Sequence, residues 1–120
     1  MINQKKIIET FNCPEWVAGS IISYTQQYKP EAAMRKINKL LDENSTYSFH
    51  GVEAITLDDQ YELKGETVYN RHYWGDCVFL YCNSGDTYSP TIGYDVNKEE
   101  FLITSWGDWY EENVKEINNA

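Results

Sequence analysis

The spacing of apolar residues changes once along this 120-residue chain, near residue 45. Before that point, apolar side chains recur every three or four residues, which is the period of a helix with one buried face. After it they recur at every second residue, which is the period of a strand. Helices that precede a run of strands predict an α+β fold rather than alternating βα units.

Two prolines divide the helical part, residues 1–44, into short segments. Pro14 and Pro30 each start a new segment, because proline suits the first position of a helix. The apolar stripes of the segments are Ile7, Ile8 and Phe11, then Val17, Ile21, Tyr24 and Tyr28, then Ala33, Met34, Ile37, Leu40 and Leu41. We therefore predict an N-terminal layer of two or three short helices.

Turn-forming Gly, Asp and Asn residues divide residues 45–107 into candidate strands. The predicted strands are Tyr47–Leu57, Glu62–Tyr73, Cys77–Asn83, Tyr88–Val96 and Glu100–Trp106. Their short connections imply antiparallel neighbours, so we expect a four- to five-stranded antiparallel sheet. Cys77–Asn83 is apolar on both faces and should be central. Pro90 places Tyr88–Val96 at an edge, or marks the point where that strand begins.

A short C-terminal helix is predicted over residues 108–118. Asp108 is the expected N-cap, with Glu111 three residues later in a capping-box arrangement. The whole chain, residues 1–120, is then one α+β domain, since its length is close to the commonest domain size. No low-complexity segment or linker interrupts it.

The charge is distributed unevenly between the two parts of the chain. Residues 1–44 contain six Lys/Arg and five Asp/Glu, a net charge of +1, whereas residues 45–120 contain four and fourteen, a net charge of −10. The two add up to the total of −9. A negative field of this kind repels nucleic-acid phosphates and anionic lipid and attracts basic partners. We therefore expect neither direct nucleic-acid binding nor membrane binding.

The three cysteines, Cys13, Cys77 and Cys82, are predicted to be small buried hydrophobic residues. If Cys77 and Cys82 lie on one regular strand, their separation of five residues places them on opposite faces, which disfavours a disulfide. No secretory signal is recognisable, so the expected location is cytoplasmic. No apolar run approaches the roughly 20 residues that a membrane span needs.

Sequence motifs of common enzymes are missing. We find no Gly-rich phosphate loop, no Gly-x-Ser-x-Gly elbow, no Cys-x-x-Cys pair and no Asp-rich calcium loop. Neither His50 nor His72 has a second histidine or a cysteine at metal-binding spacing, so a structural role is favoured for both. We predict a protein without catalytic residues, metal or cofactor, and not an enzyme.

The stretch Ile37–Ile55, INKLLDENSTYSFHGVEAI, resembles the passage from helix to first strand in NTF2-like cone proteins. The resemblance covers under a fifth of the chain. It implies helices that precede a curved antiparallel sheet. In enzymes of that family a carboxylate and a tyrosine inside the cone carry out proton transfer, and no pair in this sequence matches those roles.

Acidic residues alternate with Tyr and Trp in the second part of the chain, and these aromatic types dominate binding hot spots. We therefore expect an intracellular inhibitor that occludes a basic surface of a nuclease or defence complex, as phage counter-defence proteins of the anti-CRISPR or antirestriction type do. Its carboxylates would speed association and its aromatic anchors would slow dissociation. The predicted partner-binding residues are Asp76, Asp86, Tyr88, Tyr94, Asp95, Trp106, Asp108, Trp109, Glu111 and Glu112.

Alternatives remain open at this stage. The basic partner could be a cognate toxin, which would make the chain an immunity protein. A pocket lined by Tyr, Trp and either His50 or His72 would instead indicate an NTF2-like small-molecule binder or enzyme. A third alternative is a homo-oligomer, such as a homodimer, that holds a ligand at its subunit interface.

Overall fold

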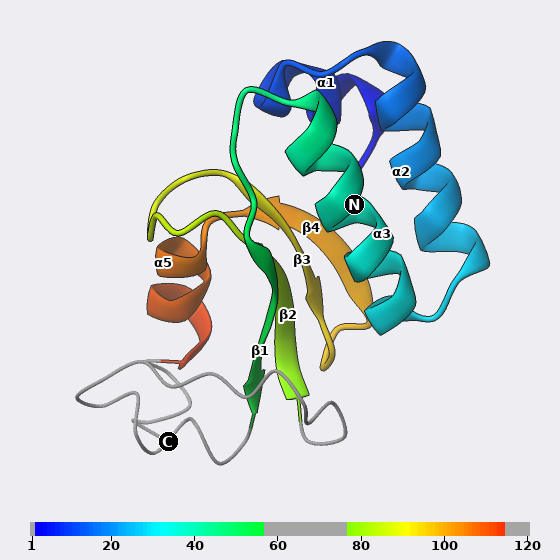
Figure 1. Ribbon diagram of the computed structural model, residues 1–120. Coiled ribbons are helices and arrows are strands. Elements are labelled where there is room, and N and C mark those ends of the chain that lie inside the picture. Colours follow the sequence, from blue (N-terminus) through cyan, green and yellow to red (C-terminus); the bar gives the residue numbers. More distant parts are fainter. Residues whose placement is uncertain (1, 57–76, 115–120) are drawn as a thin grey trace.

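The computed structural model describes residues 2–56 and 77–114, and in this part of the chain one antiparallel sheet lies between two helical layers (Figure 1). Three helices, α1 to α3, cover one face of the sheet. The short helix α5 lies against the other face. The α+β class, the N-terminal helical layer and the C-terminal helix are confirmed. The predicted strand Glu62–Tyr73 lies outside the described residues.

The helical layer begins and ends where the sequence predicts. Helix α1 spans Gln4–Phe11, α2 spans Glu15–Gln27 and α3 spans Pro30–Asn44. The Asn3 side chain caps α1 by accepting a 2.9 Å hydrogen bond from the Lys6 backbone N–H. Asn12, in the left-handed region at φ 52°, ends the helix. The two prolines start α2 and α3, and the buried residues of all three helices belong to the core that they share with the sheet. Tyr28, predicted as part of the second stripe, is instead 42% exposed at the end of α2.

The described sheet has four strands in the order β1-β2-β3-β4, all antiparallel to their neighbours. They are β1 Gly51–Thr56, β2 Cys77–Asn83, β3 Thr91–Asp95 and β4 Glu100–Thr104. Strand β2 is central and buried on both faces, as predicted. Strand β3 begins directly after Pro90 but lies between β2 and β4, so the proline marks its start and not a sheet edge.

A bulge near the start of β2 changes which face its first residue occupies. Ile55 pairs with Phe79 and Thr56 pairs with Cys77, so Val78 is the extra residue. Cys77 therefore packs with Cys82 in the core under the helices, and our expectation of opposite faces was wrong. All three cysteines are buried, as predicted. Burial raises the pKa of the Cys82 thiol, whose Sγ lies 3.8 Å from the Met34 carbonyl oxygen.

The two faces of the sheet bury different kinds of side chain. The core under α1 to α3 is mainly aliphatic and also contains Phe11 and Phe49, whose rings lie 6.1 Å apart. The opposite core is mainly aromatic and consists of Ile55, Val78, Phe79, Tyr81 and Trp109. There the Trp109 and Phe79 rings stack with centroids 4.1 Å apart.

Gly93 on β3 makes room for this aromatic core. A Cβ atom at Gly93 would lie 2.4 Å from two carbon atoms of the Phe79 ring. That distance is far inside van der Waals contact, so the Phe79 ring lies directly over the backbone of β3. The absence of a side chain at this position is therefore a packing requirement.

The closing helix begins earlier than predicted. Helix α5 spans Trp106–Trp109 and continues as a single π-helical turn over Tyr110–Val114. Ser105 is the N-cap, because its Oγ accepts a 3.1 Å hydrogen bond from the Asp108 backbone N–H. The assignment of Asp108 as the N-cap was wrong, and β4 correspondingly ends at Thr104 instead of Trp106.

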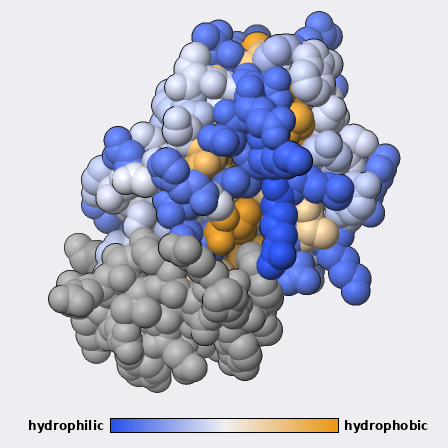
Figure 2. Space-filling view, in the orientation of Figure 1, coloured by the Kyte–Doolittle hydropathy of each residue, from blue (hydrophilic) through white to orange (hydrophobic). Residues whose placement is uncertain are grey.

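The surface on the side shown in Figure 2 is mainly hydrophilic, and hydrophobic side chains show only in small areas. This distribution agrees with the burial of the helix stripes and of both faces of β2. Among the helices of the described part, none is long and apolar enough to cross a bilayer.

Candidate functional site

The connection between β2 and β3, residues 84–90, folds back onto the start of α5. The Gly107 backbone N–H donates a 2.8 Å hydrogen bond to the Thr87 carbonyl oxygen. The Tyr88 ring also lies against Gly107, where an added Cβ would approach the ring to 2.6 Å. Two segments that lie some 20 residues apart in sequence are thereby held together as one surface.

Polar side chains fix the conformation of this loop from within. Asn83 Oδ1 accepts a 2.8 Å hydrogen bond from the Gly85 backbone N–H, and Asp86 Oδ1 accepts one of 3.2 Å from the Tyr88 backbone N–H. The Ser84 hydroxyl donates to the Asp86 carbonyl oxygen at 3.2 Å. Gly85 has a φ of 77°, which favours glycine. The Asn-Ser-Gly-Asp sequence thus produces consecutive side-chain turns that present Tyr88 outward.

Three acidic residues, Asp86, Asp108 and Glu111, interact with Tyr88 at this junction. Tyr88 is 58% exposed, and its hydroxyl donates a 2.7 Å hydrogen bond to Glu111 Oε1. This hydrogen bond, together with the negative charges of Glu111 and Asp108, raises the pKa of Tyr88. Asp86 and Glu112 are also exposed. We call this set, Asp86, Tyr88, Asp108, Glu111 and Glu112, the acidic surface.

The acidic surface has no basic residue in its own segments. Residues 84–90 and 105–114 together contain four Asp/Glu and no Lys or Arg. The repulsion among these carboxylates is therefore not relieved from within the loop or the helix, and the surface favours a positively charged partner.

Three predicted partner-binding residues lie elsewhere. Asp95 and Trp109 are only 4% and 2% exposed, and the Trp109 indole N–H donates a 3.4 Å hydrogen bond to Asp95 Oδ2. These two side chains are interior and cannot contact a partner directly. Tyr94 packs on Phe101 on the helix-covered face, where burial, followed by the charges of Glu99 and Asp95, raises its pKa. Asp76 lies outside the described residues.

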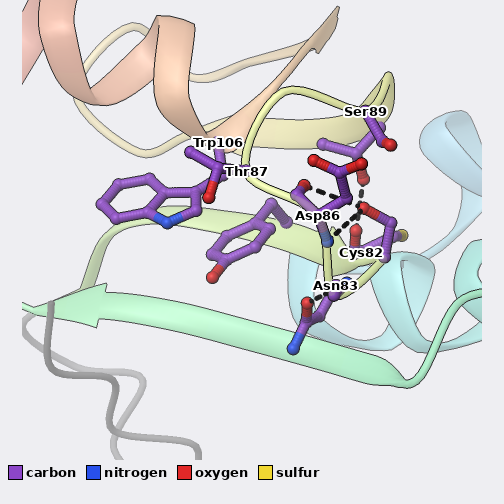
Figure 3. A pocket seen from close by; sticks show the side chains of 10 residues that line it. Cys82, Asn83, Asp86, Thr87, Ser89 and Trp106 are labelled. Carbon is purple, nitrogen blue, oxygen red and sulfur yellow. Dashed lines mark hydrogen bonds between the residues drawn. The ribbon is translucent and has the colours of Figure 1, made fainter.

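A cavity of about 230 Å³ opens beside the acidic surface, between the loop and the sheet. Figure 3 shows Trp106 on one side of it, with Asn83 and Ser89 on the other. Tyr81 also lines it, and its ring stacks on that of Trp106 with centroids 5.8 Å apart and planes 18° apart. Asp86 belongs both to this cavity and to the acidic surface. One predicted aromatic anchor, Trp106, and one predicted carboxylate, Asp86, therefore line the same cavity.

Sequence reasoning missed Glu53, which lies next to the cavity wall. Glu53 is 3% exposed and pairs across the strands with Tyr81. Its Oε1 accepts a 3.2 Å hydrogen bond from Asn83 Nδ2, which orients the Asn83 amide. The alternation of side chains along a strand could have revealed it. Glu53 lies two residues from Ile55, so both side chains are on the same face of the sheet, the one that forms the aromatic core.

Of the two histidines for which a structural role was predicted, the structure describes His50. His50 is exposed, its backbone N–H donates to the Asn83 carbonyl oxygen at 2.6 Å, and its ring lies against Gly85. His72 lies outside the described residues. In the ranges 2–56 and 77–114, no group of three or more His, Cys, Asp or Glu side chains is arranged to hold a metal ion.

Comparison of the chain with protein families, with curated proteins and with solved structures finds no match. The likeness of Ile37–Ile55 to NTF2-like proteins thus gains no support from these comparisons.

Proposed function

We propose that this chain is a non-enzymatic inhibitor that docks its acidic surface onto a basic surface of another protein. The observation that carries the proposal is the junction at Tyr88. There an exposed aromatic ring is hydrogen-bonded to Glu111 and feels the charge of Asp108, and the Asp86 carboxylate accepts a hydrogen bond from the backbone N–H of Tyr88. Exposed aromatic residues within a charged rim are the usual composition of a binding hot spot.

The proposed mechanism is occlusion of a surface that binds phosphates. The carboxylates of Asp86, Asp108, Glu111 and Glu112 take the positions of phosphate groups and raise the association rate through long-range attraction. Tyr88, fixed by its hydrogen bond to Glu111, supplies contact area at little entropic cost and slows dissociation. A nuclease or defence complex has such a basic surface, which makes the chain an inhibitor of the phage counter-defence type, anti-CRISPR or antirestriction-like.

The test is affinity capture from a host lysate, with identification of the bound proteins by mass spectrometry and measurement of their binding kinetics. We expect the chain to retain a basic, nucleic-acid-handling protein. The double variant Glu111→Lys/Glu112→Lys should slow association about ten-fold or more at low salt. A matched control, Glu15→Lys/Glu43→Lys, reverses two exposed charges on α2 and α3 and should leave association nearly unchanged.

The outcome also separates this proposal from its competitors. Capture of a toxin would assign the chain to the immunity proteins, with the same surface in use. Binding that is insensitive to salt and to the reversal at Glu111 and Glu112 would contradict the electrostatic docking itself. The cavity beside the acidic surface does not favour the small-molecule alternative, because its volume of about 230 Å³ is below the roughly 300–1,000 Å³ usual for such sites. A cavity of about 390 Å³, lined by Tyr28, Tyr94 and Phe101 among others, lies within that range, and ligand binding there would support the alternative.

A further inference from the structure

We infer that the cavity between α2 and the β3–β4 hairpin, which we call the hairpin groove, binds a small organic amine with an apolar body. The hairpin groove has a volume of about 390 Å³ and shares no lining residue with the acidic surface. It is therefore a second site, and the inference does not depend on the docking proposal. Three features of the groove carry it: apolar walls, a tyrosine hydroxyl group without a hydrogen bond, and two carboxylates.

The groove exists because the helical layer does not cover the whole sheet. Helix α3 packs on β1, β2 and β3, whereas α2 packs mainly on α1 and α3. Strand β4 lies beyond β3, so space is left between it and α2. The volume is within the roughly 300–1,000 Å³ usual for small-molecule sites. A second cavity of about 270 Å³ adjoins the groove, because Pro30, Tyr94 and Glu99 line both.

The walls of the groove suit an apolar body. Tyr94 and Phe101 pair across β3 and β4, and their rings line the sheet side with centroids 4.7 Å apart. Ile2 and Ile22 line the helical side. All four side chains belong to the core under the helices or pack against it, so their positions are fixed. An aromatic or branched aliphatic group that enters the groove leaves water for an apolar surrounding.

Tyr94 supplies a polar contact within these walls. The residue is half-buried, and its hydroxyl group takes part in no hydrogen bond with the described residues. Burial, followed by the charges of Glu99 and Asp95, raises the pKa of Tyr94, so the phenol keeps its proton at neutral pH. The phenol oxygen can still accept a hydrogen bond from an ammonium group. A ligand that provides this hydrogen bond gives a partly desolvated group its partner.

The charge of the groove selects a cation. Glu99 and Glu100 line it, and its lining residues include no Lys or Arg. Neither carboxylate forms an ion pair within residues 2–56 and 77–114. Lys29 lines only the adjoining cavity, together with Glu31. The groove therefore attracts an ammonium group and repels carboxylate and phosphate ligands.

The test compares three probes that share a phenyl body but differ in charge: 2-phenylethylamine, 2-phenylethanol and 3-phenylpropionate. Each is titrated into the intact chain at low salt while the backbone amides of Ile22, Glu100 and Phe101 are followed by NMR. We expect saturable shifts with the amine. The alcohol should bind about three- to five-fold more weakly, because an exposed ion pair contributes only modestly, and the carboxylate should bind most weakly.

The key variant is Glu99→Gln/Glu100→Gln, which keeps the shape of both side chains but removes their charges. It should raise the dissociation constant of the amine about three- to five-fold and leave that of the alcohol unchanged. Unchanged alcohol binding shows that the groove itself is intact. The matched control, Glu15→Gln/Glu43→Gln, removes two exposed charges of α2 and α3 that line neither cavity and should bind all three probes like the parent chain.

A second variant, Tyr94→Phe, tests the hydroxyl group while retaining the ring that packs on Phe101. Both the amine and the alcohol can form a hydrogen bond with this hydroxyl group, so both should bind about three-fold more weakly. Equal affinity of Tyr94→Phe and the parent chain for both probes would remove Tyr94 from the site.

The outcomes also separate this inference from the docking proposal. The amine site is refuted if no probe gives saturable shifts, if the carboxylate binds as tightly as the amine, or if Glu99→Gln/Glu100→Gln binds the amine like the parent chain. Docking is judged separately, by the reversal at Glu111 and Glu112. Amine binding together with capture of a basic protein assigns two sites to the chain, whereas amine binding without a captured protein favours the small-molecule alternative.

Discussion

The two faces of the sheet are both closed by helices, yet they are built from different chemistry. The face under α1 to α3 is filled by aliphatic side chains, and its helices come from a segment with a net charge of +1. The face under α5 holds stacked aromatic rings, with Glu53 and Asp95 buried at its margins. The first face contributes stability, whereas the second connects the interior to the acidic surface through Trp106 and Tyr81.

The two sides of the molecule also differ in how their charged residues are arranged. In residues 1–44 the carboxylates are mixed with a similar number of Lys and Arg, whereas Asp86, Asp108, Glu111 and Glu112 have no basic residue in their own segments, so their fields add. Two contacts hold the loop that carries Asp86 against α5 and the aromatic core. The Tyr88 hydroxyl donates to Glu111, and the Gly107 backbone N–H donates to the Thr87 carbonyl oxygen. We therefore expect substitutions under α1 to α3 to lower the free energy of unfolding without changing partner association, and substitutions in the acidic surface to do the reverse.

The largest effect is expected from Phe11→Ala on the helix-covered face. Phe11 is fully buried, and its ring lies 6.0 Å from that of Tyr47 and 6.1 Å from that of Phe49. Loss of the ring leaves a cavity, so the free energy of unfolding should fall by about 3–5 kcal/mol in urea titrations. Association with the proposed basic partner should be unchanged in the folded fraction, because the Phe11 side chain lies in the core under the helices and is not part of the acidic surface.

The control for this variant is Trp16→Ala, which removes an aromatic ring that is 60% exposed on α2. Its unfolding free energy should change by no more than about 0.5 kcal/mol. If Phe11→Ala altered partner association as strongly as the reversal at Glu111 and Glu112, the separation of a stabilising face from a binding face would be wrong.

A smaller loss is expected from Trp109→Phe on the aromatic face. Phenylalanine keeps an aromatic ring against Phe79 but removes the indole N–H that donates to Asp95 Oδ2. A buried carboxylate then lacks one of its donors, and the free energy of unfolding should fall by about 1–3 kcal/mol. Adding Asp95→Asn to this variant removes the buried charge and should recover part of the loss. A double variant less stable than Trp109→Phe alone would count against this reading.

The smallest effect concerns Tyr88 at the surface. Its hydroxyl donates to Glu111, which favours the protonated phenol, so Tyr88 should lose its proton at a higher pH than an ordinary tyrosine, whose pKa is about 10. Glu111→Gln removes the charge and should move the pKa back down. Ultraviolet absorbance of the tyrosinate, compared with Tyr88→Phe to identify the signal, measures the shift. An unchanged titration in Glu111→Gln would show that the hydrogen bond is not maintained in solution.

Periodicity predicted the fold well because each element has one clear pattern. The stripe of α3 and the uninterrupted apolar run of β2 led to correct placement of both elements. The boundaries were harder, since Ser105 and Asp108 both suit an N-cap and only packing of α5 on Phe79 decides between them. The bulge at Val78 left no signal in the apolar pattern, because both faces of β2 are buried.

The sequence indicated which types of residue form the site, but not which of them lie next to one another in space. Asp86 and Glu111 were recognised as exposed carboxylates, yet their meeting at Tyr88 depends on the contact between the loop and Gly107, which no local pattern encodes. Asp95 was assigned to the surface because aspartate is seldom buried, whereas the indole of Trp109 gives it an interior partner. Glu53 was missed for the same reason.

The close approach of Phe79 to Gly93 restricts which sequences can encode this fold. Any side chain at position 93 meets the ring at 2.4 Å, whereas one at Gly19 meets its nearest atom at an ordinary 3.6 Å. In a library that samples all amino acids at both positions, alanine should survive selection at position 19 and be eliminated at position 93. A change from Gly93 would become acceptable only together with a smaller residue at position 79, so these two positions should vary as a pair during evolution.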